Sequence, residues 1–112
     1  MIIIYHNNRC TKSRCALELI QKKTNDFKVV EYLKDTPSEK ELKEILKKLG
    51  MKAEEIIRRK EPLFNKFKGK KLSEDQWMKI LVKNPILIER PIVVKGNKAV
   101  IGRPTENVLG II

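Results

Sequence analysis

The chain has 112 residues, with 25 Lys and Arg against 14 Asp and Glu, a net charge of +11, one His and two Cys. This length fits one domain. Its apolar runs fall far short of the roughly 18–20 residues that a membrane helix needs, and the N-terminus does not read as a signal peptide. We therefore expect a cytoplasmic protein, in which two cysteines do not make a disulfide framework.

The positive charge raises the question of nucleic acid. Of the cations, 19 are Lys and six are Arg, and the lysines mostly alternate with Glu. Mixed charge of this kind is typical of solvated helix faces. Phosphate contacts stay possible, but the few aromatic residues form no stacking motif, and we do not expect nucleic acid to be the partner.

The first third of the chain predicts a βαβ unit. Residues 2–5 are apolar and β-branched, as in a buried strand. A helix is predicted over 11–23, where Ala16 and Ile20 share a face, and a second strand over 27–33. This arrangement implies a parallel pair of strands with a right-handed crossover.

The remainder predicts helices around a hairpin. Capping boxes at Ser38–Glu41 and Ser73–Gln76 each begin a helix; the first ends at Gly50 and the second at about Lys83. The other predicted elements are a short helix over 52–58, strands over 91–94 and 99–101 joined at Gly96–Asn97, and a last helix from Pro104 to near Ile112.

The order of these elements favours an α/β fold. A βαβ half and a ββα half, separated by a helical insertion, suit a mixed four-stranded sheet flanked by helices, as in thioredoxin-like folds. We expect a single domain over residues 1–112.

Cys10 is the main candidate for chemistry. It lies where the first strand has ended and the helix over 11–23 begins, so its thiol faces the positive end of that helix. Arg9, Lys12 and Arg14 are close in sequence, and both effects favour a thiolate. The alternative is a partly buried Cys in a turn, although this turn is polar and cationic.

Neither of the two positions considered after Cys10 supplies an obvious partner for a disulfide. Ser13 occupies the second position of a Cys-x-x-Cys pattern, which excludes a dithiol cycle within that motif. Cys15 lies five residues further, about 7.5 Å along a regular helix, beyond the roughly 7 Å limit for a disulfide. We interpret Cys15 as a packed helix residue.

Arginines are the candidate anion ligands. Arg90 and Arg103 each precede a proline, which restricts the backbone and so aims the side chain. A guanidinium offers a planar fork to tetrahedral oxyanions, although surface ion pairing is the ordinary alternative. Arg58 and Arg59 are a further pair, which placement at a helix end also explains.

His6 is the only histidine. It lies four residues before Cys10 and could move a proton or hold the turn, and a structural role is as common. No Cys/His cluster indicates a metal and no Gly-rich loop indicates a nucleotide.

The sequence resembles the glutaredoxin-linked arsenate reductase family, related to Spx-type regulators. The resemblance runs nearly end to end and is carried by residues 5–14, Arg58 with Glu61–Pro62, residues 84–94 and residues 101–109. It implies a thioredoxin-like arsenate reductase-type domain with a cis bond before Pro91. Two positions depart from the family pattern. Asn8 replaces the common Pro, which implies a less rigid turn before Cys10, and Cys15 replaces Asn or Gln, which leaves a role as a second thiol open.

The resemblance also implies a set of roles. Cys10 is the implied nucleophile; Arg58, Arg90 and Arg103 are the implied oxyanion ligands; His6, Ser13 and Arg14 are the implied supporting residues. The implied reaction reduces arsenate with glutathione as co-substrate and glutaredoxin as partner, by a monomer with no bound cofactor. The alternatives are an Spx-like regulator that binds RNA polymerase, or a glutathione-dependent oxidoreductase with another substrate.

Overall fold

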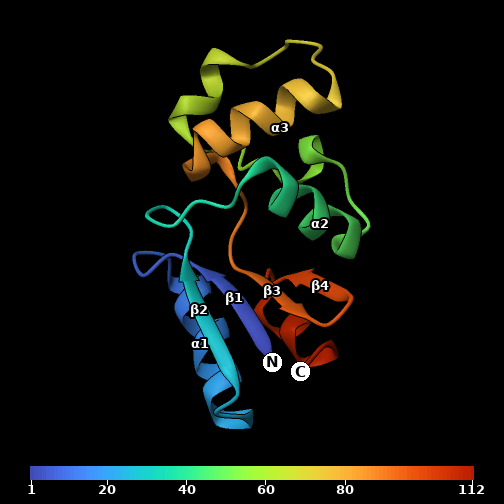
Figure 1. Ribbon diagram of the computed structural model, residues 1–112. Coiled ribbons are helices and arrows are strands. Elements are labelled where there is room, and N and C mark those ends of the chain that lie inside the picture. The colour runs from blue at the N-terminus through green and yellow to red at the C-terminus, as the bar shows by residue number, and fades with distance from the viewer. The chain divides into compact units, whose positions relative to one another are not determined.

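The computed structural model describes all 112 residues and shows two compact units (Figure 1). The first unit comprises Met1–Asp35 and Arg90–Ile112, and the second comprises Thr36–Glu89. None of the helices combines the length and apolar character needed to cross a membrane. The single domain predicted over 1–112 stays a prediction.

The first unit contains a mixed sheet with strand order β2-β1-β3-β4. Strand β1 (Ile2–His6) pairs in parallel with β2 (Phe27–Glu31) and antiparallel with β3 (Ile92–Lys95), which forms a hairpin with β4 (Lys98–Ile101). The predicted parallel pair and hairpin are both confirmed. Strand β2 ends two residues before the predicted end, because the amides of the following turn bond to the Glu31 carbonyl.

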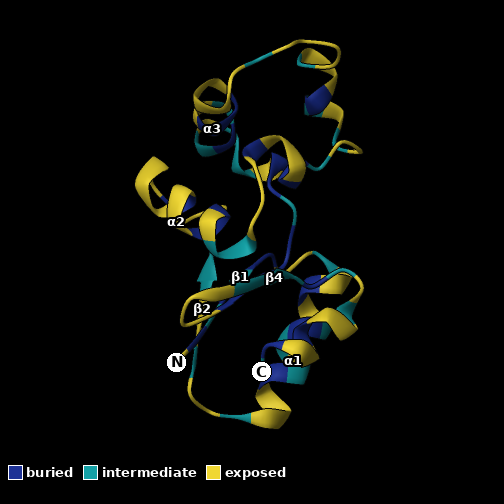
Figure 2. Cartoon of the chain, turned by 90° about the vertical axis from the view of Figure 1, so that its right-hand side faces the viewer, coloured by how far each residue is buried: buried dark blue, intermediate teal, exposed yellow.

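Helix α1 (Thr11–Lys23) and the 3₁₀ helix η4 (Thr105–Gly110) contact each other and pack on one face of this sheet (Figures 1 and 2). Ile4 and Val93 from the sheet meet Ala16 from α1 in a fully buried core. Helix α1 spans the predicted residues. The predicted last helix is present, but it is a 3₁₀ helix that begins after Pro104.

The second unit is helical. It contains α2 (Glu39–Leu49) and α3 (Glu74–Lys83), which contact each other. Ser38 accepts a hydrogen bond from the Glu41 amide at the start of α2, and Gly50 ends α2 with a positive φ of 69°. At the start of α3, Ser73 and Gln76 form the reciprocal capping box that the sequence predicts.

Three short 3₁₀ helices complete this unit, two of them between α2 and α3 and one after α3. They are η1 (Ala53–Ile56), η2 (Pro62–Lys66) and η3 (Pro85–Leu87). The helix predicted over 52–58 covers only Ala53–Ile56. It ends there because Ile57 forms an antiparallel bridge with Ile88 and the Arg58 amide donates to the Leu87 carbonyl at 2.7 Å. These long-range bonds hold the chain extended where a helix would have continued.

Candidate active site

Cys10 lies at the junction between β1 and α1. It is the N-cap residue of α1, with an extended backbone at φ −96° and ψ 119°. No acidic residue lies in the first turn of this helix, so the positive end of the helix is not compensated there. This position favours a negatively charged sulfur.

Two arginines that are distant from Cys10 in the sequence contact its sulfur. Arg103 donates from Nη2 to the Cys10 Sγ at 3.2 Å, and from Nε to the backbone carbonyl of Arg90 at 2.7 Å. The Arg90 side chain is buried and also hydrogen-bonds to Cys10. The two predicted arginines are therefore adjacent at the predicted thiol.

The β3–β4 hairpin explains why residues 13 positions apart meet. Arg90 precedes β3 and Arg103 follows β4, so the antiparallel pairing returns the chain to its starting point. The Gly102 amide closes this end with a 2.8 Å hydrogen bond to the Pro91 carbonyl. The peptide bonds before Pro91 and Pro104 are both cis, of which the resemblance implied only the first.

The charge state of Cys10 follows from these contacts. Burial by itself raises the pKa of the thiol, but three lowering effects together outweigh it. They are the hydrogen bond from the Ser13 backbone amide, the hydrogen bond from the Arg90 side chain, and the positive charges of Arg103 and Arg90. The pKa of Cys10 therefore lies below its ordinary value, which makes the sulfur a better nucleophile at neutral pH.

A chain of side chains extends from the first turn of α1 to the end of β2. The Ser13 Oγ accepts the Asn7 amide at 3.1 Å and lies 2.6 Å from the Nδ1 of the buried His6. The other ring nitrogen of His6 lies 2.6 Å from the Asn8 Oδ1, and the Asn8 Nδ2 donates to Glu31 at 2.5 Å. His6 and Ser13 were predicted to support the site, whereas Asn8 and Glu31 were not predicted as part of it.

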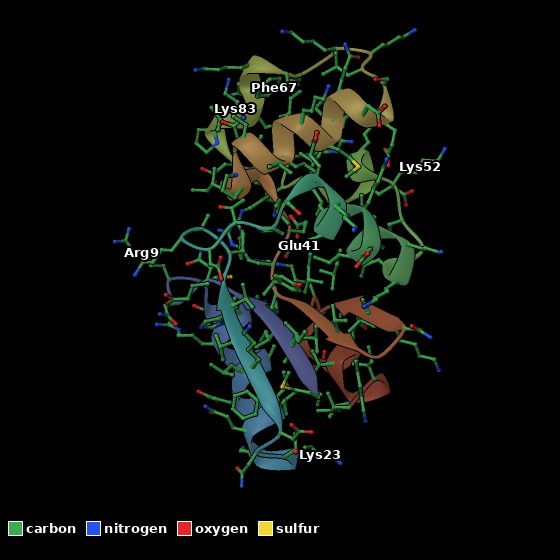
Figure 3. All side chains as sticks on the ribbon, viewed as in Figure 1. Arg9, Lys23, Glu41, Lys52, Phe67 and Lys83 are labelled. Atoms are coloured by element: carbon green, nitrogen blue, oxygen red, sulfur yellow. The ribbon has the colours of Figure 1, made fainter.

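The cations next to Cys10 in the sequence, unlike Arg90 and Arg103, are not among the groups that lower its pKa. Arg9, Lys12 and Arg14 are all exposed. Arg9 points away from the loop (Figure 3), and Arg14 donates to Thr11 at 3.3 Å. None of the three is among the groups that lower the pKa of Cys10. The sequence-based explanation of the thiolate is therefore corrected: the helix start contributes, but the cations are Arg90 and Arg103.

Arg58 and Arg59 lie in the second unit and differ in their surroundings. Arg58 is partly buried, its Nε lies 3.9 Å from a Glu61 carboxylate oxygen, and its Nη1 is buried without a hydrogen-bond partner. Arg59 is exposed, lies against the Phe64 ring and is 4.0 Å from Glu54. Of the two, Arg58 has the unsatisfied donor that an anion would complete, and its role as a ligand stays a prediction.

Cys15 is half-buried on α1 and, like Cys10, has a free thiol. No group of three or more His, Cys, Asp or Glu side chains is arranged to hold a metal ion.

The fold and the site together define a class of protein: a thioredoxin-like fold, here a mixed four-stranded sheet with flanking helices, that carries a single activated cysteine between arginines. Residues 5–111 match the ArsC family. The chain belongs to this family.

Three related proteins show how far the similarity extends. An uncharacterized Escherichia coli protein, YfgD, is 45% identical, over 97% of this chain and 94% of its own. An arsenate reductase from Neisseria meningitidis serogroup A is 39% identical, over 99% of this chain and 97% of its own. The solved structure of an arsenate reductase from Vibrio cholerae superimposes with a TM-score of 0.93 at 38% identity, and the match covers 99% of this chain and 97% of that one.

Proposed function

We propose that this protein is an arsenate reductase in which Cys10 attacks arsenate. The observation that carries the proposal is the Cys10 sulfur at the start of α1, hydrogen-bonded by both Arg90 and Arg103. A thiolate held by two guanidinium groups suits attack on a tetrahedral oxyanion, because the same cations that lower the thiol pKa can bind the oxygens of the substrate. The relatives named arsenate reductase support arsenate as that oxyanion.

In the first step the Cys10 thiolate attacks the pentavalent arsenic. A sulfur–arsenic bond forms, and one arsenate oxygen takes up protons and leaves as water. Arg90 and Arg103 stabilise the remaining oxygens, and Arg58 is the proposed third ligand. His6 and Ser13 are the proposed supporting residues in the loop and the first turn of α1, whereas Arg14, predicted with them, is exposed and donates to Thr11.

In the second step an external thiol, which we propose is glutathione, attacks the Cys10 sulfur. The sulfur–arsenic bond breaks and its electron pair stays on arsenic, which leaves as trivalent arsenite. The two sulfurs are now a mixed disulfide, so the two electrons gained by arsenic come from two thiols. Glutaredoxin then restores Cys10 by thiol–disulfide exchange. This cycle is proposed for a cytoplasmic monomer without a bound cofactor.

The test is a coupled assay. Arsenate-dependent NADPH oxidation is followed with glutathione, glutaredoxin and glutathione reductase present, and omission of each thiol component tests the proposed reductant. We expect activity with the complete system and none with Cys10→Ser. The matched control is Cys15→Ser, which makes the same chemical change at the other thiol and should keep its activity.

Two results would contradict the proposal. Arsenate turnover that survives Cys10→Ser would remove Cys10 as the nucleophile. A folded wild-type protein with no turnover in the complete system would remove arsenate reduction itself.

A further inference from the structure

Asn8 links His6 to Glu31 through two hydrogen bonds, and the chemistry of the groups determines which atom donates in each. A carboxylate oxygen only accepts, so the Asn8 amide must present its NH₂ group to Glu31, as it does at 2.5 Å. The Asn8 Oδ1 then faces the His6 Nε2 at 2.6 Å. An amide oxygen cannot donate, so the proton of this bond belongs to the imidazole Nε2.

The same reasoning continues to Ser13. With its proton on Nε2, a neutral imidazole has Nδ1 as an acceptor, and Nδ1 lies 2.6 Å from the Ser13 Oγ. For the neutral ring, the Ser13 hydroxyl then donates to His6 while its oxygen accepts the Asn7 amide at 3.1 Å. Every hydrogen bond from Ser13 through His6 and Asn8 to Glu31 then has a defined donor and a defined acceptor.

The register of the sheet makes this arrangement possible. Strands β1 and β2 are parallel, and His6 pairs with Glu31 at the last position of both. Asn8 lies two residues past that pair and bridges their side chains.

We infer that Glu31 and Asn8 are positioning residues that hold His6 in its Nε2–H tautomer and thereby fix the direction of the Ser13 hydroxyl. Neither residue touches the reacting atoms. They act through His6 on the serine that ties the Asn7 amide to the first turn of α1, next to Cys10. The catalytic consequence of this inference rests on the proposed function, whereas the tautomer itself does not.

The single histidine gives a direct test of the tautomer. Long-range ¹H–¹⁵N correlation spectra of the uniformly labelled protein at neutral pH contain one imidazole, which needs no assignment. We expect a protonated, pyrrole-type Nε2 and an unprotonated, pyridine-type Nδ1. An Nδ1–H tautomer, a tautomeric average or a doubly protonated ring in the wild-type protein would overturn the inference.

Glu31→Gln tests the origin of the preference. A glutamine side chain can either accept from Asn8 or donate to a reversed Asn8 amide, so both directions of the chain become possible. We expect the ¹⁵N shifts of His6 to move toward a tautomeric average. The matched control is Lys34→Gln, which removes the 3.7 Å ion pair on the outer side of Glu31 and leaves the chain of hydrogen bonds intact. Unchanged wild-type shifts in folded Glu31→Gln would overturn the inference.

Kinetics of the same variants test the consequence. If the two tautomers become equally populated, the competent fraction falls to about one half, so kcat should fall about twofold at an unchanged KM for arsenate. Lys34→Gln should keep the wild-type kcat. An unchanged kcat in Glu31→Gln, with its His6 shifts averaged, would show that the tautomer does not position Cys10. Because the spectra do not require turnover, an inactive wild-type protein would overturn the proposed function and leave the tautomer measurement valid.

Discussion

Gly102→Ala is the substitution for which the structure gives the clearest magnitude. A Cβ at Gly102 would lie 2.8 Å from the Pro91 Cγ and 3.1 Å from the Val108 Cγ2, whereas carbon atoms prefer about 3.5–4.0 Å. The neighbours cannot move easily, because Pro91 is a ring bonded through its carbonyl to the Gly102 amide and Val108 is fully buried. Overpacking of this kind costs about 1–3 kcal/mol of the free energy of unfolding.

The assay is equilibrium unfolding in urea, with Gly110→Ala as the matched control. A Cβ at Gly110 would meet nothing within 4 Å, so that variant reports the general effect of Gly→Ala on the unfolded chain, at most about 1 kcal/mol in favour of folding. Relative to this control, Gly102→Ala should lose about 1–3 kcal/mol. A difference within about 0.5 kcal/mol would refute the packing argument, since exposed substitutions vary by that much.

The same substitution should reduce activity. Gly102 precedes Arg103, whose guanidinium is held by the Arg90 carbonyl at 2.7 Å and reaches Cys10 at 3.2 Å. Moving the chain away from Pro91 displaces this arginine, so we expect a lower kcat/KM for arsenate at a urea concentration where the variant is still folded. Wild-type kcat/KM in a destabilised variant would show that the contact supports stability alone.

Two further predictions concern the thiolate and a helix cap. Because the pKa of Cys10 is lowered in the folded state, the thiolate should increase the free energy of unfolding of the wild type relative to Cys10→Ser. This increase should be fully present above the unfolded pKa of about 8.5 and should be lost as the pH falls through the folded pKa. Urea midpoints measured across this range test the sign, and a difference that does not vary with pH would contradict a folded-state thiolate. Ser73→Ala removes the acceptor of the Gln76 amide at the start of α3 and should cost about 1 kcal/mol in the same assay, whereas no loss would show that the cap contributes nothing.

The elements that the sequence predicted best are those with local signals. Helix α1 and the two capped helices have their predicted bounds within a residue or two, because apolar spacing and capping side chains act within a few residues. The 3₁₀ helices over 62–66 and 85–87 were not predicted. The shortened helix at 53–56 shows why such segments escape prediction: the bridge from Ile57 to Ile88 spans 31 residues, and no local pattern contains it.

The candidate site shows the same division. The two arginines that precede prolines were predicted as anion ligands. Arg90 lies just before the β3–β4 hairpin and Arg103 just after it, so the hairpin brings both to the Cys10 sulfur. Glu31 was missed because its connection depends on the register of two parallel strands. The signal was available: had β1 been aligned with β2 from their first residues, His6 would have paired with Glu31.

The position of Cys15 explains why the proposed cycle needs a second molecule. Counted along α1, Cys15 lies five residues past Cys10, which is about 7.5 Å along the axis and about 140° around it. A disulfide requires Cα atoms within about 7 Å and side chains directed toward each other, and the residue at the favourable position, Ser13, has a hydroxyl bound to His6. The chain has no third cysteine. Regular helix geometry therefore does not place Cys15 to form a disulfide with Cys10, which supports the proposal that an external thiol such as glutathione reduces Cys10.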